Sequence, residues 1–256
     1  MELPNPVLER TATDASVGQS TLRRSWDRVI AAPAYASNAA DRRTFSLVGL
    51  ELPVRTTAVI VVVTFAILLD HTRILIPAEL PGRAPETMRF VALERFFLFG
   101  VVPLALVLLA FRDRPSRYGL TLGEWRWGIG LLLLGSMVMT PIVLAFAQLP
   151  DARAYYAESA APVPDLLVTN TLDLAAAEFT YRGLLMLTLV RAIGPLGVLV
   201  ASLPFVFAHL GKPPLELFST LGGGMAYGWL AWRTGSIVWG AIAHVYILTL
   251  VTVAAG

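Results

Sequence analysis

Two charged residues interrupt an otherwise apolar stretch of the chain, AAAEFTYRGLL at residues 175–185. Glu178 and Arg182 are four residues apart, so a helix places both side chains on the same face. An ion inside a bilayer is costly, and such residues usually face the interior of a helix bundle and have a function. The pair alone leaves two interpretations open: an acid held ionised for catalysis, or a buried ion pair that only fixes helix register.

The histidines favour the catalytic interpretation. The chain has three of them, and His209 and His244 fall within apolar segments. A histidine changes charge near neutral pH, and a carboxylate beside it can share the deprotonation of water. A lone histidine in an apolar helix is more often a hydrogen-bonded core residue, but two of them beside a buried ion pair indicate a hydrolytic site. His71 follows Asp70 at the end of another apolar segment, where we expect an interfacial residue without a catalytic role.

Five further polar residues have plainer interpretations. Asp173 lies on a different helical face from the charged pair, which favours a hydrogen bond between helices or a place in the lining of a pore. Glu94 and Arg95 stand near the predicted outer start of a span, within snorkelling distance of water. Lys212 and Glu216 flank a break between two segments, where they cap the next helix or border the mouth of a site.

The elements that must position these groups are apolar helices. The chain is 56% hydrophobic and 15% charged, with a mean hydropathy of +0.66, whereas about a quarter of the residues of a soluble domain are charged. Seven segments come close to the roughly 20 residues that cross the hydrocarbon of a bilayer. The sequence therefore predicts an all-α fold, a polytopic transmembrane bundle of about seven spans. They are residues 54–76, 89–111, 127–149, 165–190, 194–210, 214–233 and 235–255, with Pro204 expected to kink the short fifth span.

The chain is expected to have two parts, an arm at residues 1–50 and one helical domain at 51–256. The arm is polar and basic, and no apolar segment follows a short basic start, so we expect no cleaved signal peptide. It is interpreted as a partly disordered cytoplasmic arm, with a helix on the lipid surface as an option. Arginines favour the cytoplasmic side of a membrane. The loop between the second and third spans agrees with this orientation, since it contains Arg112, Arg114, Arg117 and Arg126. The first external loop opposes it, since it contains Arg73, Arg83 and Arg89.

Composition and spacing also exclude several functions. Cysteine is absent, which rules out disulfides, thiol catalysis and thiolate metal sites. Half of the 20 basic residues precede residue 90, a distribution that fits membrane orientation better than nucleic-acid binding. No internal repeat is visible, which argues against an inverted-repeat transporter. The small residues of STLGGGMAYG at 219–228 have the spacing of closely packed helices.

Three motifs give the chain a resemblance to a known family. AEFTYRG at residues 177–183 resembles the E-E-x-x-x-R-G motif of the CPBP family, which includes the CAAX proteases and bacteriocin-processing enzymes. FVFAH at residues 205–209 matches the second motif of the family, F-x-x-x-H. His244 occupies the histidine of the third motif, in a span that follows RTGSIVWG at residues 233–240. The resemblance covers about residues 115–250, with the motifs in the right order on consecutive spans.

The resemblance implies an intramembrane protease of the glutamic type. Glu178 and His209 would activate water, His244 would polarise the scissile carbonyl, and Arg182 would orient the carboxylate of Glu178. A hydrogen-bond donor placed where charge develops contributes about 3–4 kcal/mol in such a site. No metal or cofactor is needed. Zinc held by the Glu/His/His set is a less favoured alternative, since three protein ligands and a water form a catalytic zinc site.

The chain departs from the family pattern at two positions. Ala177 replaces the first glutamate of the first motif, and Leu248 stands where the third motif commonly has asparagine. The alternatives are a subgroup with a single glutamate, impaired catalysis, or an engineered inactivation at residue 177. We favour the subgroup, because GKPPLE at residues 211–216 and the form x-E-F-x-[FY]-R-G resemble myxosortase-like bacterial enzymes. Those enzymes cleave the C-terminal sorting anchors of exported proteins.

The sequence thus predicts an intramembrane endopeptidase of the bacterial inner membrane, with its N-terminus in the cytoplasm. Its expected partners are the lipid bilayer and a membrane protein whose transmembrane or C-terminal sorting segment enters between the helices. Nucleic acid is not expected, and no feature indicates an oligomeric state. A catalytically silent scaffold or bacteriocin-immunity-type protein is the main alternative, because of Ala177 and Leu248. A proton-coupled carrier is the third hypothesis.

Overall fold

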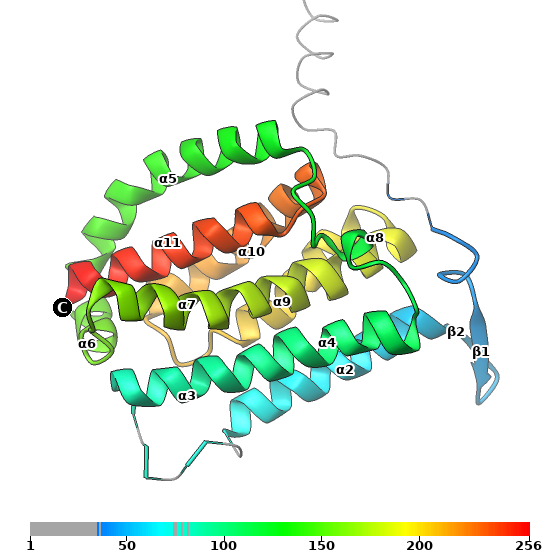
Figure 1. The fold of residues 1–256 in the computed structure, drawn as a ribbon, viewed down its shortest axis with the longest axis horizontal. Coiled ribbons are helices and arrows are strands. Elements are labelled where there is room, and N and C mark those ends of the chain that lie inside the picture. The colour runs from blue at the N-terminus through cyan, green and yellow to red at the C-terminus, as the bar shows by residue number, and fades with distance from the viewer. Residues whose placement is uncertain (1–34, 36, 74–75, 78, 81) are drawn as a thin grey trace, which may run out of the picture. The chain divides into compact units, whose positions relative to one another are not determined.

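The computed structural model describes residues 35, 37–73, 76, 77, 79, 80 and 82–256. Residues 34–256 form one compact unit, which is mostly helical (Figure 1). Most of the predicted arm, residues 1–34, lies outside the described residues. The described part of the chain therefore agrees with the predicted all-α class, apart from one short hairpin.

The seven apolar segments predicted from the sequence all correspond to helical elements. The first two are α2 (Val54–Thr72) and a continuous run of α3 (Pro85–Arg95), η1 (Phe96–Val101), α4 (Val102–Ala105) and η2 (Leu106–Ala110). A 3₁₀ turn, η3 (Pro115–Tyr118), then leads to α5 (Trp125–Ala147) and the short α6 (Pro150–Ala157). The fourth segment is α7 (Val163–Glu178), η4 (Phe179–Met186) and α8 (Leu187–Ile193). The last three are α9 (Leu196–Phe207), α10 (Pro214–Thr234) and α11 (Val238–Ala255).

Four of these segments are long and apolar enough to cross a membrane: Val54–Thr72, Pro85–Ala110, Trp125–Ala147 and Val238–Ala255. The other three differ for physical reasons. Helix α9 has only 12 residues, and α7 to α8 carries several charges in its apolar sequence. Glycines and two charges lower the hydropathy of α10. A membrane protein is thus supported, whereas the number of seven crossings stays a prediction.

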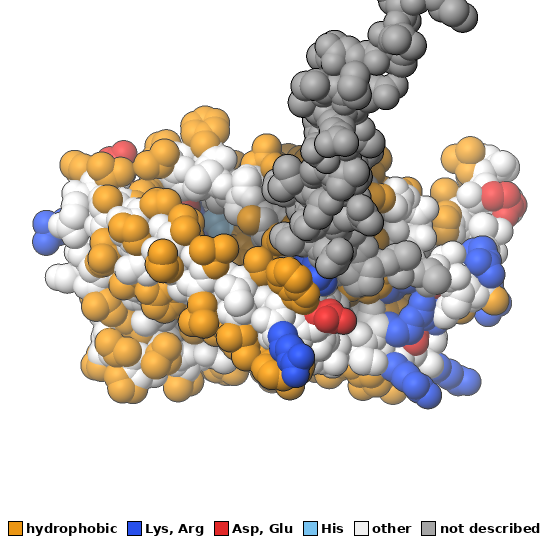
Figure 2. Space-filling view, turned by 90° about the horizontal axis from the view of Figure 1, so that it is seen from above, with side chains coloured by type: hydrophobic (Ala, Val, Ile, Leu, Met, Phe, Trp, Pro, Cys, Tyr) orange, Lys and Arg blue, Asp and Glu red, His pale blue; other side chains and the backbone are white. Residues whose placement is uncertain are grey.

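The helices that carry the candidate residues pack at the centre of the unit. Helix α11 contacts both α5 and α7, α10 contacts α9, and α7 contacts α3. Figure 1 shows α5 along one side of this group and α2 with α3 along the other. The outer face of α5 exposes large apolar side chains such as Leu133, Met137 and Val138, and apolar side chains cover much of the face in Figure 2. An apolar exterior of this kind suits contact with lipid.

The small residues of α10 allow close packing on α9, as predicted. A Cβ atom on Gly224 would lie 3.2 Å from the Ser202 side chain, and one on Gly228 would lie 2.9 Å from Val198. Gly223, by contrast, faces open space. The close approach therefore involves Gly224 and Gly228 and not every small residue of the 219–228 stretch.

A hairpin that the sequence did not predict precedes the first helix. Strands β1 (Thr44–Leu47) and β2 (Leu50–Pro53) pair in antiparallel fashion around Val48 and Gly49, both of which have positive φ. Two positive φ values are typical of the tight turns that match strand twist. The hairpin crosses the expected boundary at residue 50.

Ion pairs tie the segment before the hairpin to the loop after η2. Arg55 Nη1 lies 2.9 Å from both Asp41 Oδ1 and Asp113 Oδ2. Arg117 binds the same two carboxylates at 2.8 and 2.6 Å. The segment that precedes the first span and the loop between the second and third spans therefore lie at the same end of the bundle, as their shared basic charge suggested.

Candidate active site

The first motif lies where α7 changes from α-helical to π-helical winding. Glu178 is the last residue of α7, and the following eight residues form the π-helix η4. Short π-helical segments occur frequently at functional sites. Gly183 is needed there, because a Cβ atom would lie 2.5 Å from the backbone oxygen of Tyr118.

The carboxylate of Glu178 is fully buried between two cationic or ionisable side chains. Its Oε1 lies 2.9 Å from Nδ1 of His244 and 3.3 Å from Nη1 of Arg182. Its Oε2 has no hydrogen-bond partner among the described residues. A Cβ atom on Gly240 would approach that oxygen to 3.3 Å, so the glycine lets α11 come close to the acid.

Aromatic rings fix the guanidinium of Arg182. Its Cζ lies 3.8 Å from the centroid of the Phe205 ring and 5.5 Å from that of Tyr227. A cation over a ring face gains electrostatic energy, more so when it is removed from water. Arg182 is therefore placed to hold the charge and the position of Glu178, the role that the resemblance implied for it.

His209 is held by the backbone of its own helix end. Its Nδ1 lies 2.7 Å from the carbonyl oxygen of Phe205. A carbonyl only accepts hydrogen bonds, so Nδ1 carries the proton and the neutral ring leaves Nε2 as an acceptor. This tautomer suits a group that removes a proton from water.

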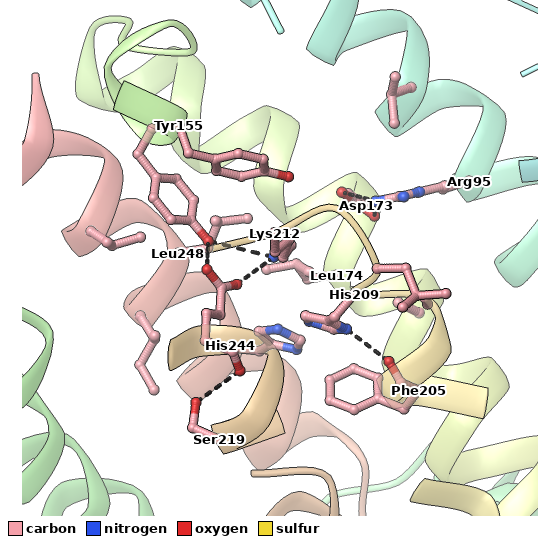
Figure 3. Close-up of a pocket in the computed structure, with 18 of the residues that line it drawn as sticks. Arg95, Tyr155, Asp173, Leu174, Phe205, His209, Lys212, Ser219, His244 and Leu248 are labelled. Atoms are coloured by element: carbon pink, nitrogen blue, oxygen red, sulfur yellow. Dashed lines mark hydrogen bonds and ion pairs between the residues drawn. The ribbon is translucent and has the colours of Figure 1, made fainter. Parts of the chain in front are cut away.

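His244 lies between two aromatic rings. It stacks on Tyr227 with centroids 5.1 Å apart and contacts Phe205 at 5.8 Å, while the ring of His209 lies 4.5 Å from Phe205. Both imidazoles therefore adjoin the same phenyl ring, and Figure 3 shows them side by side. Helices α9 and α11 bring the two predicted histidines together.

Both histidines line one cavity of about 560 Å³. Its other walls include apolar residues of α5 and α11, such as Ile142, Val143 and Ile247. Figure 2 shows a histidine in a recess between apolar side chains. Glu178 and Arg182 are not part of the lining. The acid therefore reaches the cavity only through His244, to whose ring it is hydrogen-bonded, and the described residues show no bond from it to His209.

The two positions that depart from the family pattern also lie on the cavity wall. Ala177 and Leu248 both line it. The cavity is consequently apolar at the two places where the resemblance leads one to expect a carboxylate and an amide.

Two polar clusters lie in the cavity wall, and the sequence predicts the ion pairing of neither. Arg95, for which the sequence indicates only nearness to water, binds Asp70 at 2.6 Å and Asp173 at 3.1 Å. Asp173 lines the cavity, in line with the pore-lining option. The presence of Asp70 and Asp173 on other apolar segments could have indicated ionic partners for Arg95. Only the packing of α2, α3 and α7, however, shows that both carboxylates bind this one arginine.

The second cluster joins the turn after α9 to α6. Lys212 and Glu216 form an ion pair of 2.7 Å and line the cavity, as the mouth interpretation predicted. The hydroxyl of Tyr156 donates to Glu216 at 2.6 Å. His71 also lines the cavity, although it is an exposed residue.

No group of three or more His, Asp or Glu side chains within the described ranges is arranged to hold a metal ion. Glu178 and His244 are in contact, and the hydrogen bond from His209 Nδ1 to a carbonyl leaves Nε2 of that ring open. In the arrangement that the structure describes, these three side chains are not grouped as the ligands of one metal ion.

Comparison with known proteins gives one match. No curated protein and no solved structure matches the chain. A family model described as "Type II CAAX prenyl endopeptidase Rce1-like" matches residues 159–249. This range contains Glu178, Arg182, His209 and His244 and extends from the start of α7 into α11. Over these residues, the chain is similar to the Rce1-like type II CAAX prenyl endopeptidases.

Proposed function

We propose that the protein is an intramembrane endopeptidase that hydrolyses a peptide bond in or near the transmembrane or C-terminal segment of a membrane protein. The observation that carries this proposal is the contact of 2.9 Å between Glu178 and His244 beside a cavity that His209 also lines. The similarity over residues 159–249 supports it. A carboxylate, two imidazoles and a partly apolar cavity are the parts that water-dependent cleavage of an apolar peptide requires.

The hydrogen bonds support separate roles for the two histidines. Nε2 of His209 takes a proton from water as the water oxygen attacks the scissile carbonyl, and later gives that proton to the leaving nitrogen. His244, oriented by the carboxylate of Glu178, donates a hydrogen bond to the oxygen on which negative charge develops. Glu178 thus acts through His244, which differs from the shared-base role that the resemblance implied. No step in this scheme requires a metal or cofactor.

We further propose that the enzyme belongs to the single-glutamate subgroup and resides in a bacterial membrane. Ala177 and Leu248 leave apolar wall where other members have polar groups, which suits an apolar substrate segment such as a sorting anchor. We place the enzyme in the bacterial inner membrane, with seven spans and a cytoplasmic N-terminus. The basic residues near Arg55 and Arg117 support that orientation.

Mass spectrometry of protein termini tests the proposal. Membranes from cells that contain the wild-type chain are compared with membranes containing His209→Ala or His244→Ala at equal abundance. We expect membrane-protein fragments with new C-termini near apolar segments only with the wild-type chain. Identical termini in all three samples would refute proteolysis.

A catalytically silent scaffold is the second candidate, favoured by the apolar side chains of Ala177 and Leu248 in the cavity wall. It predicts that the two histidine variants retain full biological activity. The same samples therefore separate the candidates in a complementation assay.

A further inference from the structure

Besides the two histidines, the cavity wall carries a group of polar side chains. They come from α6, from the connection that leads into α3, and from the turn before α10, which also carries His209. Figure 3 shows Lys212 between Tyr155 and His209. Four cationic side chains line the cavity: Arg73, Arg83, Arg95 and Lys212.

Two of these cations are neutralised by carboxylates. Arg95 binds Asp70 at 2.6 Å and Asp173 at 3.1 Å. Lys212 binds Glu216 at 2.7 Å. Neither has charge left over for a ligand.

Neither Arg73 nor Arg83 has a carboxylate of the described residues within ion-pair distance, and Arg83 is the one of the two whose guanidinium is held in place by hydrogen bonds to Tyr155. The carboxylate of Glu158 is near in the fold, but it accepts a hydrogen bond of 2.6 Å from the backbone N–H of Arg83. The positive charge of the side chain is therefore left without a carboxylate at the cavity wall.

The guanidinium of Arg83 is nevertheless held in a fixed position. Nε donates to the backbone oxygen of Tyr155 at 3.3 Å, and Nη1 donates to the Tyr155 hydroxyl at 2.7 Å. The group also lies 3.8 Å from the centroid of the Tyr155 ring. Nη2 has no hydrogen-bond partner among the described residues, so a pre-oriented donor remains for a ligand.

A second cation adjoins the same place. Arg83 Cζ lies 6.0 Å and Lys212 Nζ 5.9 Å from the centroid of the Tyr156 ring. Glu216 is the one carboxylate paired with either of these cations in the described chain. Within the cavity lining, the group formed by Arg83, Lys212 and Glu216 thus has one excess positive charge. Glu158, bound to the backbone of Arg83, is not part of that lining.

We propose that this group, the Arg83 site, binds a carboxylate of the substrate peptide. The inference rests on the proposed function and names one feature of its substrate. A guanidinium presents its donors in the geometry of a carboxylate, and one carboxylate balances the excess charge. Arg83 lies in the loop that the proposed orientation places outside the cytoplasm, where arginines are less frequent. A role in binding would account for its presence there. The carboxylate belongs either to an acidic residue beside the apolar segment or to the C-terminus of the peptide.

Three synthetic peptides distinguish these sources. Each has the same apolar core of about 20 Leu and Ala residues. One has an Asp beside the core and an amidated C-terminus, one has Asn and a free C-terminal carboxylate, and one has Asn and an amide. The full-length chain carries Glu178→Gln so that hydrolysis is slow compared with the binding measurement, and it is embedded in phosphatidylcholine nanodiscs. Fluorescence anisotropy gives each Kd.

We expect one carboxylate peptide to bind about tenfold more tightly than the neutral peptide, as a charge-assisted hydrogen bond would produce. Arg83→Gln should remove this preference and leave binding of the neutral peptide unchanged. Arg89→Gln is the matched control, because Arg89 pairs with Asp165 at 3.0 Å and does not line the cavity. It should keep the preference. Equal binding of all three peptides, or a preference that persists in folded Arg83→Gln protein, overturns the proposal.

Two further measurements keep the test decisive. If Arg83→Gln does not fold, salt is added to the parent protein: a preference that does not weaken with ionic strength overturns the proposal. In nanodiscs with phosphatidylglycerol, loss of the preference would assign Arg83 to a lipid phosphate and also overturn it. Because the assay measures binding, absence of proteolysis by the wild-type chain would refute the proposed function without removing a measured carboxylate preference.

Discussion

The carboxylate of Glu178 on α7 lies 2.9 Å from Nδ1 of His244 on α11. Because the carboxylate accepts this bond, the imidazole keeps a proton on Nδ1 and turns its other nitrogen toward a different partner. His244 is the member of the pair that lines the cavity. In the proposed function, the acid therefore orients the histidine without itself lining the cavity.

Replacement of Glu178 by Gln tests this relationship. The amide oxygen can still accept from Nδ1, but it no longer places a negative charge beside the imidazole. We expect the cleavage rate to fall about 10²-fold, the typical loss for one stabilising donor of a developing oxyanion. The rate is measured on a substrate found by the termini comparison. Glu94→Gln is the control, since Glu94 is also buried and unpaired but does not line the cavity; an equal loss in both variants would contradict the assignment.

The role of His209 predicts a rescue experiment. His209→Ala removes the acceptor nitrogen, and we expect the rate to fall by about 10²–10⁴. The vacated space adjoins the cavity, so added imidazole should restore part of the activity. His71→Ala serves as the control because His71 also lines the cavity but has no assigned proton transfer. Unchanged activity in His209→Ala would exclude this histidine as the base.

The helical spacing of Glu178 and Arg182 was enough to predict that they meet, because residues four apart share a helix face. The sequence also identified the two histidines, since a histidine in an apolar segment is unusual. Their common cavity depends on the packing of α9 and α11 against Phe205, which no local pattern contains. For that reason the partner of Glu178 could not be predicted: the bond to His244 depends on the close approach of α11 at Gly240.

Three other features could not be predicted from the sequence either. The snorkelling interpretation of Arg95 used only its distance from the segment end, whereas its partners Asp70 and Asp173 come from two other helices. The turn at Val48 and Gly49 lacks the usual Asn-Gly or Asp-Gly signal, so the hairpin went unnoticed. The π-helical winding after Glu178 has no recognised sequence signature.

The buried ion pair predicts a non-additive effect on stability. Arg182→Met leaves Glu178 with one fewer cation in a fully buried place, which costs about 3–5 kcal/mol when one partner of a buried pair is removed. Adding Glu178→Gln should recover part of that loss, because no uncompensated acid remains. Thermal unfolding in detergent measures the free energies of a double-mutant cycle. Strictly additive losses would show that the two side chains do not interact.

Gly183 predicts a loss of stability from a small substitution. In Gly183→Ala, the new methyl group would lie 2.5 Å from the backbone oxygen of Tyr118. The backbone cannot move aside as easily as a flexible side chain. We therefore expect the free energy of unfolding to fall by about 1–3 kcal/mol, which is typical of overpacking. Gly130→Ala and Gly135→Ala on α5 are matched controls with nothing within 4 Å of the added atom. They should be neutral or stabilising, since alanine favours helix; equal losses at all three sites would contradict the packing argument.

Asp41 predicts how stability depends on acid pH. Burial alone would raise the pKa of Asp41, but hydrogen bonds from the Asn38 backbone, Arg55 and Arg117 outweigh it and lower the pKa below its ordinary value. The folded state therefore binds this proton less readily than the unfolded state. The stabilisation is complete above the unfolded-state pKa of about 3.9 and is lost as the pH falls through the lower folded-state pKa.

Thermal unfolding between neutral pH and about pH 3 measures this contribution across the ordinary pKa of an aspartate. Asp41→Asn should lower the unfolding temperature at neutral pH, and its difference from the wild type should shrink as the solution becomes more acidic. Glu51→Gln is the control, because its carboxylate accepts only from Thr44 on the neighbouring strand and forms no ion pair in the described chain. A gap between wild type and Asp41→Asn that stays constant with pH would show that the carboxylate charge does not hold the segment before the hairpin to Arg55 and Arg117.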